Sequence, residues 1–252
     1  MGSAYKALLG YRRPFASLAE ANAAVAAYEN GGHQSQVNRA THLRFSQTAR
    51  PSDYAAMFHI DRLLPGIRRV FDLGGNVGNL FYCYRQFLEF PDDLTWHVND
   101  LPGNMAAGES LAKDRGVSQL QFVHGWQQAA GADLLLASGS LHYFERPLPL
   151  MVSELPCKPR YVLINRTPLT EGPAFATIQD DCSIRVAAMI YNRGELIEGF
   201  EALGYVLMNE WQCYELSLYT PGYPEHAVPY YSGMLLRAAE ADQRPQKGRC
   251  ET

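Results

Sequence analysis

Short apolar runs alternate with longer stretches of helical spacing through the middle of the chain. The runs are rich in Val, Leu, Ile and Phe, as strands buried on both faces of a sheet are. They lie at 70–73, 96–100, 121–126, 133–137 and 160–165. Helical patterns follow the first two runs, from Val77 towards Phe90 and from Asn104 to Arg115, where Gly116 ends the helix. This alternation predicts an α/β domain with a mostly parallel sheet.

The ends of this region add further elements. Residues 51–65 read as a helix with Ser52 as its cap, and a second helix is expected at 195–203. Residues 205–211 and 232–238 alternate like two antiparallel strands. We therefore expect one domain over residues 51–238, preceded by a helical segment at 1–50 and followed by a disordered polar tail at 239–252.

The N-terminal segment has a recognisable helix start. Ser17 and Glu20 have the spacing of a capping box, and an alanine-rich run follows as far as Tyr28. A helix in this place can close over a bound ligand as a lid, or it can pack on the edge of the sheet. The sequence leaves both interpretations open.

Composition excludes several classes of protein. The 252 residues carry a net charge of −4, which does not favour a nucleic-acid partner. No apolar run has the length of a membrane span, and the five scattered cysteines follow no secretory signal. The seven histidines show no metal-ligand spacing. We expect a cytoplasmic monomer or homodimer without a metal site.

A glycine turn follows the first apolar run. The sequence from Val70 to Leu80 is VFDLGGNVGNL, an apolar strand, a turn and the start of a helix. Such a turn brings a ligand close to the backbone and directs free N–H groups of the helix at it. The dinucleotide pattern G-x-G-x-x-G fails, because Asn76 and Asn79 occupy two of its glycine positions. No lysine is present for a phosphate-binding Walker loop.

An acidic residue ends the second strand. Asp100 follows Trp96-His97-Val98-Asn99, and in doubly wound sheets a carboxylate at this position holds ribose hydroxyls. An ionised carboxylate can accept hydrogen bonds from two neighbouring hydroxyls at once. The alternative is a solvated aspartate at the start of the turn that follows. With the glycine turn upstream, we expect the ribose role.

These motifs resemble the first motif of class I S-adenosylmethionine (SAM) methyltransferases, Asp/Glu-x-Gly-x-Gly-x-Gly, with Asn76 in place of the middle glycine. Asn reaches positive φ more easily than other non-glycine residues, so the substitution is compatible. Together with Ser138–Tyr143, Ile164–Leu169 and Tyr191–Arg193, the motifs resemble more narrowly a family of bacterial SAM methyltransferases from polysaccharide and secondary-metabolite gene clusters.

The resemblance implies a Rossmann-like fold with a seven-stranded, mostly parallel sheet, an antiparallel last strand and an N-terminal helical cap. It implies SAM as the cofactor, S-adenosylhomocysteine as its product and a small-molecule acceptor. Gly125 and Trp126 flank the adenine in this interpretation, although Trp126 is equally suited to the core. The expected cofactor-binding residues are Asp72, Gly74, Gly75, Asn76, Gly78, Asn79, Asp100, Leu101, Gly125, Trp126, Ser138 and Gly139.

Side chains beyond the fourth and fifth strands are candidates for the chemistry. His142 is the preferred general base, because an unperturbed imidazole titrates near neutrality; otherwise it binds the cofactor or a loop. Tyr143 and Tyr191 can hold the acceptor or face the sulfonium. Arg166 can bind an anionic substrate group, or can belong to a structural ion pair. Tyr219 belongs to a tyrosine-rich loop that can line an acceptor pocket.

Three functions stay open at this point. The first is methyl transfer to oxygen or nitrogen of a small molecule. The second is cyclisation of SAM itself to azetidine-2-carboxylate and methylthioadenosine, a reaction of proteins that resemble this family. The third is a non-catalytic SAM-binding protein.

Overall fold

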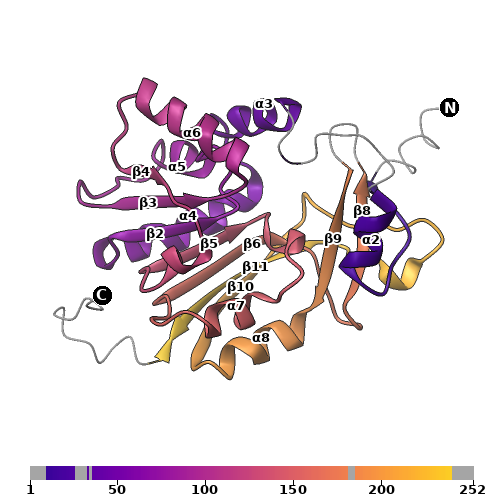
Figure 1. The fold of residues 1–252 in the computed structure, drawn as a ribbon. Coiled ribbons are helices and arrows are strands. Elements are labelled where there is room, and N and C mark those ends of the chain that lie inside the picture. The colour runs from indigo at the N-terminus through magenta and orange to yellow at the C-terminus, as the bar shows by residue number, and fades with distance from the viewer. Residues whose placement is uncertain (1–9, 26–32, 34–35, 181–184, 240–252) are drawn as a thin grey trace.

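The computed structural model describes residues 10–25, 33, 36–180 and 185–239. Seven strands form one sheet in the order β10-β11-β6-β5-β2-β3-β4. Strands β4, β3, β2, β5 and β6 are parallel, whereas β11 is antiparallel to both of its neighbours, β6 and β10 (Figure 1). This is the mostly parallel, seven-stranded α/β sheet with an antiparallel last strand that the sequence predicts.

The strands of this sheet are short, and the helices connect them. The strands are β2 (Arg69–Leu73), β3 (Thr95–Asn99), β4 (Leu120–Phe122), β5 (Leu134–Ser138), β6 (Tyr161–Thr167), β10 (Tyr205–Cys213) and β11 (Tyr231–Ala238). The helices are α2 (Leu18–Val25), α3 (Gln36–Phe45), α4 (Pro51–Leu63), α5 (Asn79–Tyr84), α6 (Pro102–Asp114), α7 (Leu148–Ser153) and α8 (Arg193–Glu201), with short 3₁₀ turns η2 (Leu64–Gly66), η3 (Trp126–Ala129), η4 (Leu141–Tyr143) and η5 (Pro224–His226).

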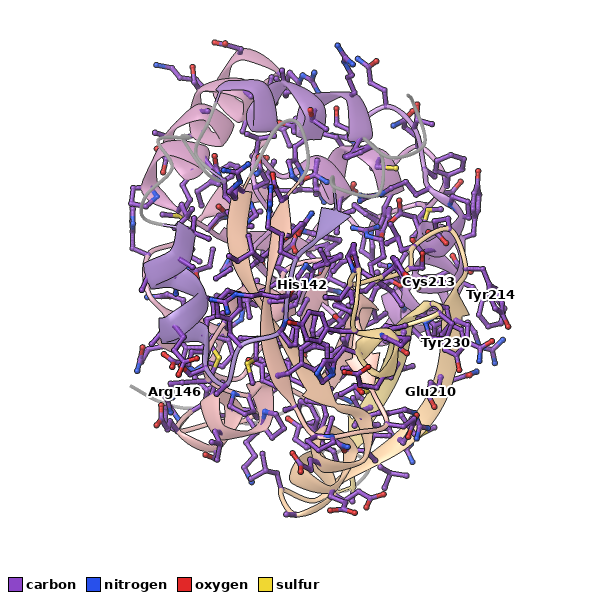
Figure 2. The ribbon with its side chains drawn as sticks, turned by 90° about the vertical axis from the view of Figure 1, so that its right-hand side faces the viewer. His142, Arg146, Glu210, Cys213, Tyr214 and Tyr230 are labelled. Atoms are coloured by element: carbon purple, nitrogen blue, oxygen red, sulfur yellow. The ribbon has the colours of Figure 1, made fainter. Side chains whose placement is uncertain are left out.

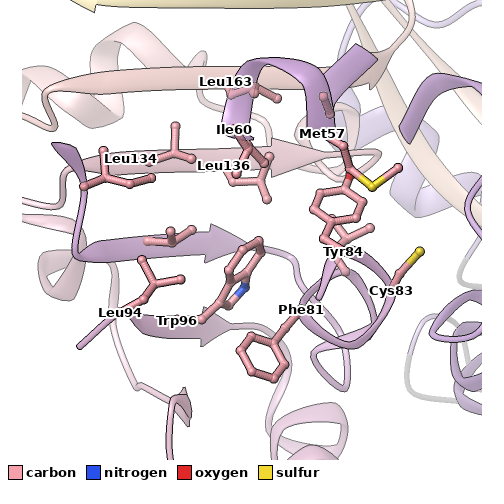
Figure 3. Packing of buried hydrophobic residues seen from close by; sticks show 14 of the residues in the cluster. Met57, Ile60, Phe81, Cys83, Tyr84, Leu94, Trp96, Leu134, Leu136 and Leu163 are labelled. Atoms are coloured by element: carbon pink, nitrogen blue, oxygen red, sulfur yellow. The ribbon is translucent and has the colours of Figure 1, made fainter. Parts of the chain in front are cut away.

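Both faces of the sheet are covered, which explains why its central strands are apolar throughout. On one face, α4, α5 and α6 pack over Trp96, Leu134, Leu136 and Leu163 (Figure 3). On the other face, α7 and α8 pack over the alternate residues of the same strands, such as Leu135. All five strand residues of β5 are buried. The layers hold the sheet rigid and leave its carboxyl edge to the loops.

The helix before β2 begins at Pro51, and its cap differs from the one that was expected. Arg50, not Ser52, occupies the cap position, because Pro51 fits the first helical turn. The backbone N–H of Arg50 donates to the Asp53 carboxylate at 2.8 Å. Ser52 is buried instead, and its N–H donates to Glu215 Oε1 at 2.9 Å. Assigning the cap to Ser52 was therefore wrong.

The helix after the glycine turn is shorter than the predicted stretch from Val77 to Phe90. Helix α5 spans Asn79–Tyr84, and beyond it the chain continues in tight turns. The N–H groups of Gln86 and Phe87 donate to carbonyls three residues back, and the N–H of Leu88 donates to Tyr84, four residues back. The helix thus ends in a mixture of 3₁₀-type and α-type turns. Phe87 is half exposed and no longer contributes to an apolar helix face.

A second sheet, which the sequence analysis did not predict, stands at the carboxyl edge of the first. It has the order β1-β8-β9-β7, with β1 (Gly10–Tyr11), β7 (Leu169–Thr170), β8 (Phe175–Asp180) and β9 (Arg185–Asn192). Helix α2 packs against β8 and β9 through Leu18 and Ala21 (Figure 1). Ser17 Oγ accepts from the N–H of Glu20 at 3.2 Å, as expected of a helix cap, while Glu20 accepts from Ala16 rather than from Ser17.

None of the described helices is long and apolar enough to cross a bilayer. The predicted tail at 239–252 lies outside the described residues, apart from Ala239.

Candidate cofactor and active site

The glycine turn adopts a backbone that depends on its residue types. Gly74, Asn76 and Gly78 have φ angles of 73°, 52° and 79°, all in the left-handed region. Asn76 therefore takes the conformation that its place in the motif requires. Gly78 is the cap of α5, so the first N–H groups of that helix lie at the end of the turn.

The turn is pressed against the loop that follows β5. A Cβ atom on Gly74 would lie 2.4 Å from the Cβ of Ser140, so no other residue fits there. The Ser140 hydroxyl donates to the carbonyl of Leu73 at 2.5 Å, and the Gly74 N–H donates to the carbonyl of Asn99 at 2.8 Å. The ends of β2, β3 and β5 are thus joined into one rigid edge.

Asp100 bends towards this turn and not into bulk solvent. Its Oδ2 accepts the N–H of Asn76 at 2.8 Å, and its Oδ1 accepts from the N–H of Leu101 and from Asn104 Nδ2, both at 2.7 Å. The side chain is half-buried. Leu101 beside it is 41% exposed and offers an apolar surface at the mouth of the site.

Asp72 is the buried acid of the motif. Its Oδ2 accepts from the Trp96 indole N–H at 3.0 Å, and it lies beneath Gly75. The pKa of Asp72 is raised to about 7, mainly by burial and to a smaller extent by the nearby Asp100, against the opposing effects of Trp96 and Arg166. A carboxyl group held in this way would gain from a bound cation.

Three buried oxygens around the turn lack a hydrogen-bond donor. They are Oδ1 of Asp72, Oδ1 of Asn76 and Oδ1 of Asn104. Buried acceptors are normally satisfied, so three of them at one edge indicate a ligand that brings donors. Ammonium and hydroxyl groups are suitable donors.

His142 does not have the properties expected of a general base. It is almost fully buried, and burial, together with His33 and Arg166, lowers its pKa to about 3. The expectation of a base titrating near neutrality was therefore wrong, because the burial could not be read from the sequence. His142 lies near the middle of the carboxyl edge (Figure 2), with its ring 4.0 Å from that of Tyr143.

The candidate tyrosines have different surroundings. The Tyr143 hydroxyl donates to Gln179 Oε1 at 2.6 Å, which ties the loop after β5 to the second sheet. Tyr191 is buried, and its hydroxyl donates to the carbonyl of Phe144. Tyr219 is 60% exposed to solvent and does not join them.

Arg166 has φ 52° and is buried in an ion pair with Asp53, one of the two alternatives for this residue. It also donates to the carbonyl of Ser138 at 3.3 Å, and it faces Gly139. Arg50 shares the same carboxylate, with its Nε 3.3 Å from Asp53 Oδ2. Two guanidinium groups thus share one buried carboxylate beside the end of β5.

Trp126 and Gly125 lie after β4. The indole N–H of Trp126 donates to the carbonyl of Met151 at 2.9 Å, and its ring packs edge-on against Phe71. Trp126 thus contacts the core, the second of its two predicted alternatives. Gly125 has φ 90° and is exposed, with open space around it.

Residues before the domain also reach the site, and no motif pointed to them. The His33 ring is 4.1 Å from that of Tyr143, and its carbonyl accepts from Asn104 Nδ2 at 3.3 Å. His42 lies on α3 within hydrogen-bonding reach of Asn79. Asp53, inside the domain, was not singled out either, although an acid at the third position of a helix is a signal of a helix start.

The described residues contain no group of three or more His, Cys, Asp or Glu side chains arranged to hold a metal ion.

No family model and no curated protein sequence matches the chain. Solved structures do match its fold. The sheet order and the glycine turn define a Rossmann-like fold of the class I methyltransferase type. One similar structure is 1,6-didemethyltoxoflavin-N1-methyltransferase of Burkholderia thailandensis with bound 1,6-didemethyltoxoflavin and S-adenosylhomocysteine, at 19% identity, covering 91% of this chain and 93% of that one, with a TM-score of 0.51. Another is magnesium protoporphyrin IX methyltransferase of Synechocystis PCC 6803 with bound SAM, at 11% identity, covering 86% and 96%, with a TM-score of 0.50.

Proposed function

We propose that this protein is a SAM-dependent methyltransferase that acts on oxygen or nitrogen of a small molecule. The observation that carries the proposal is the set of unsatisfied acceptors around the glycine turn, Oδ1 of Asp72, Asn76 and Asn104. The α-ammonium and ribose hydroxyls of SAM are donors of the kind these atoms lack. The two similar methyltransferases were solved with SAM or S-adenosylhomocysteine, which supports the same ligand here.

The residues along the edge would contact successive parts of this ligand. Asp100, beside Leu101, would hold the ribose, and the turn from Gly74 to Asn79 would seat the amino-acid part. Asp72 would interact with the positive charge, because a cation favours the ionised carboxylate that burial disfavours. Ser138 and Gly139, the small residues at the end of β5, would lie beside the methionine part.

The carboxylate of the ligand has a suitable partner in Arg50. Arg166 alone balances the charge of Asp53, so the second guanidinium is in excess. The neighbouring Arg166 lowers the pKa of Arg50, second to the effect of burial. A bound carboxylate would relieve this repulsion, and arginine is well suited to bind one in bidentate geometry.

When bound, SAM supplies a methyl group on a positively charged sulfonium. The contribution of the protein is then orientation and exclusion of water, which can amount to roughly 7–11 kcal/mol. The lowered pKa of His142 makes its neutral imidazole a weak base, so it would accept a hydrogen bond from the acceptor rather than take its proton completely. Tyr143 and Tyr191, with their hydroxyls held, would present fixed aromatic surfaces.

The N-terminal segment would act as a lid in part only. Helix α2 packs on β8 and β9, as in the alternative of a helix on a sheet edge. His33, in contrast, touches both Tyr143 of η4 and Asn104 of α6, which follow the strands on either side of β2. The covering role would therefore fall to the region of His33 and α3.

Product analysis tests the proposal. The protein is incubated with SAM alone, and with SAM plus panels of phenols, hydroxy acids and amines, and the nucleoside product is identified by mass spectrometry. Acceptor-dependent S-adenosylhomocysteine is the expected result. Acceptor-independent methylthioadenosine with azetidine-2-carboxylate would replace methyl transfer by the cyclisation alternative. Failure to bind either SAM or S-adenosylhomocysteine would contradict both enzymatic functions.

A further inference from the structure

Asn165, near the carboxyl end of β6, is a fully buried amide that uses all of its hydrogen-bonding capacity. Its Nδ2 donates to Ser138 Oγ at 3.2 Å and to the carbonyl of Ser52 at 3.3 Å. Its Oδ1 accepts from the Trp211 indole N–H at 3.0 Å and from the Cys213 thiol at 3.6 Å. An amide has two donors and one oxygen that can accept twice, so no further partner is needed. One side chain thus joins β5, α4 and β10 at the carboxyl edge of the large sheet.

The bond from Asn165 also orients the hydroxyl of Ser138. Since the Ser138 oxygen accepts from Asn165, its own hydrogen points away from that amide. In the described part of the chain this hydrogen meets no acceptor, because the hydroxyl donates to no residue there. Ser138 is the last residue of β5, and 9% of its surface stays exposed. Its hydroxyl is therefore available to a ligand as a donor.

The bond to the Ser52 carbonyl fixes the first turn of α4. The residue after Asn165, Arg166, forms an ion pair with Asp53 of the same turn. The N–H of Arg50, the cap of this helix, donates to Asp53 Oδ2 at 2.8 Å. Two neighbouring residues of β6 thus hold the turn that carries Arg50.

The main chain repeats this connection. The Asn165 carbonyl accepts the N–H of Gly139 at 2.8 Å. Arg166 Nη2 donates to the carbonyl of Ser138 at 3.3 Å. Arg166 has a left-handed φ of 52°, which a non-glycine residue keeps only where its surroundings hold it. The end of β5 and the start of α4 are therefore fixed to each other through residues 165 and 166.

We propose that Asn165 is a positioning residue for the amino-acid part of the cofactor. It holds the Ser138 hydroxyl and the first turn of α4, with Arg50, in the arrangement that receives this part. The inference rests on the proposed function, in which Arg50 binds the carboxylate of the ligand and Ser138 lies beside its methionine part. Asp100, which would hold the ribose, forms its hydrogen bonds with other residues. The role of Asn165 is therefore confined to one end of the ligand.

Calorimetric titration of the full-length protein with two ligands tests this role. S-adenosylhomocysteine contains the amino-acid part, whereas methylthioadenosine has the same nucleoside without it. Asn165→Leu keeps the approximate volume of the side chain and removes its hydrogen bonds. It is expected to weaken S-adenosylhomocysteine binding roughly five- to twentyfold, as the loss of one or two hydrogen bonds would. Methylthioadenosine binding should stay unchanged, a separation that a residue with a merely structural role would not produce.

Two further variants locate the effect. Trp211→Phe removes a donor to the same amide but leaves its bonds to Ser138 and Ser52, so both ligands should bind as they do to the wild type. Ser138→Ala removes the hydroxyl that Asn165 orients, and it should weaken S-adenosylhomocysteine alone, by roughly two- to tenfold. This smaller change decides the proposal should Asn165→Leu fail to fold.

Circular dichroism verifies the fold of each variant. Equal losses for the two ligands in Asn165→Leu, or a loss in Trp211→Phe as large as in Asn165→Leu, would overturn the positioning role. Undiminished S-adenosylhomocysteine binding to Asn165→Leu or to Ser138→Ala would also overturn it. A wild-type protein that binds neither ligand would contradict the proposed function itself, so the two failures can be told apart.

Discussion

Replacing Asp72 by Asn should stabilise the ligand-free protein at alkaline pH while removing its affinity for SAM. The substitution keeps the size of the side chain and an oxygen that can accept from the Trp96 indole. It removes a charge that the folded protein accommodates poorly, since burial raises the pKa of Asp72 to about 7 from 3.8. In the unfolded chain Asp72 is exposed to water, so its pKa stays at the ordinary value of 3.8.

The sign follows from proton binding. Between the unfolded pKa of 3.8 and the folded pKa of about 7, the folded protein holds a proton at Asp72 that the unfolded chain has released. The stability of the wild-type protein therefore falls as pH rises through this window. Between pH 5 and pH 8 the loss from this one group is about 2–3 kcal/mol, at 1.36 kcal/mol for each pKa unit. Asp72→Asn escapes this loss.

Urea unfolding and thermal scans of the ligand-free protein at pH 5 and pH 8 measure the effect. The stability advantage of Asp72→Asn over wild type should grow by about 2–3 kcal/mol between these pH values, or roughly 5–10 °C in Tm for a chain of this length. Asp61→Asn, an exposed change on α4, is the control and should show no such growth. An advantage that stays constant with pH would refute the account of Asp72.

Three further predictions concern the same edge of the sheet. Arg50→Met should leave the stability of the protein near that of the wild type, because Arg166 still balances the charge of Asp53. It should weaken binding of S-adenosylhomocysteine but not of methylthioadenosine, which lacks the carboxylate. Equal weakening for both ligands would contradict this prediction. Gly78→Ala should lower the free energy of unfolding, measured in urea, by more than Gly116→Ala does. Gly116→Ala introduces only backbone strain of roughly 1 kcal/mol, because Gly116 has open space around it, whereas a Cβ at Gly78 would lie 2.6 Å from Leu120. Because the pKa of His142 is lowered to about 3, protonation of His142 should not reduce kcat near pH 6.5. At saturating SAM, the wild type and His142→Gln should therefore have the same pH dependence of kcat around pH 6.5.

The large sheet could be predicted because its signals are local. Each apolar run is short, and glycine or an acid ends it, so strand identity and order along the chain follow from residues such as Gly74 and Asp100. The antiparallel β11 was also predicted, from the alternation within residues 232–238. These features depend on neighbours in the sequence.

The second sheet and the surroundings of the candidate base could not be predicted, because they depend on distant residues. Strand β1 pairs with β8 over more than 160 positions, and the hydroxyl of Tyr143 finds its acceptor in Gln179. The low pKa of His142 arises from burial and from His33 and Arg166, neither of which is adjacent in the sequence. Local patterns carry no information about such contacts.

Calorimetric titration with S-adenosylhomocysteine, on the wild-type protein and on Asp100→Ala, tests most directly whether the edge formed by the ends of β2, β3 and β5 is a nucleoside site. Asp114→Asn, an exposed change at the end of α6, is the matched control, and circular dichroism verifies that each variant is folded. We expect one molecule to bind per chain in the wild type and in Asp114→Asn, with binding lost in Asp100→Ala. No heat of binding to the wild type at high micromolar ligand, or undiminished binding to a folded Asp100→Ala, would contradict the account.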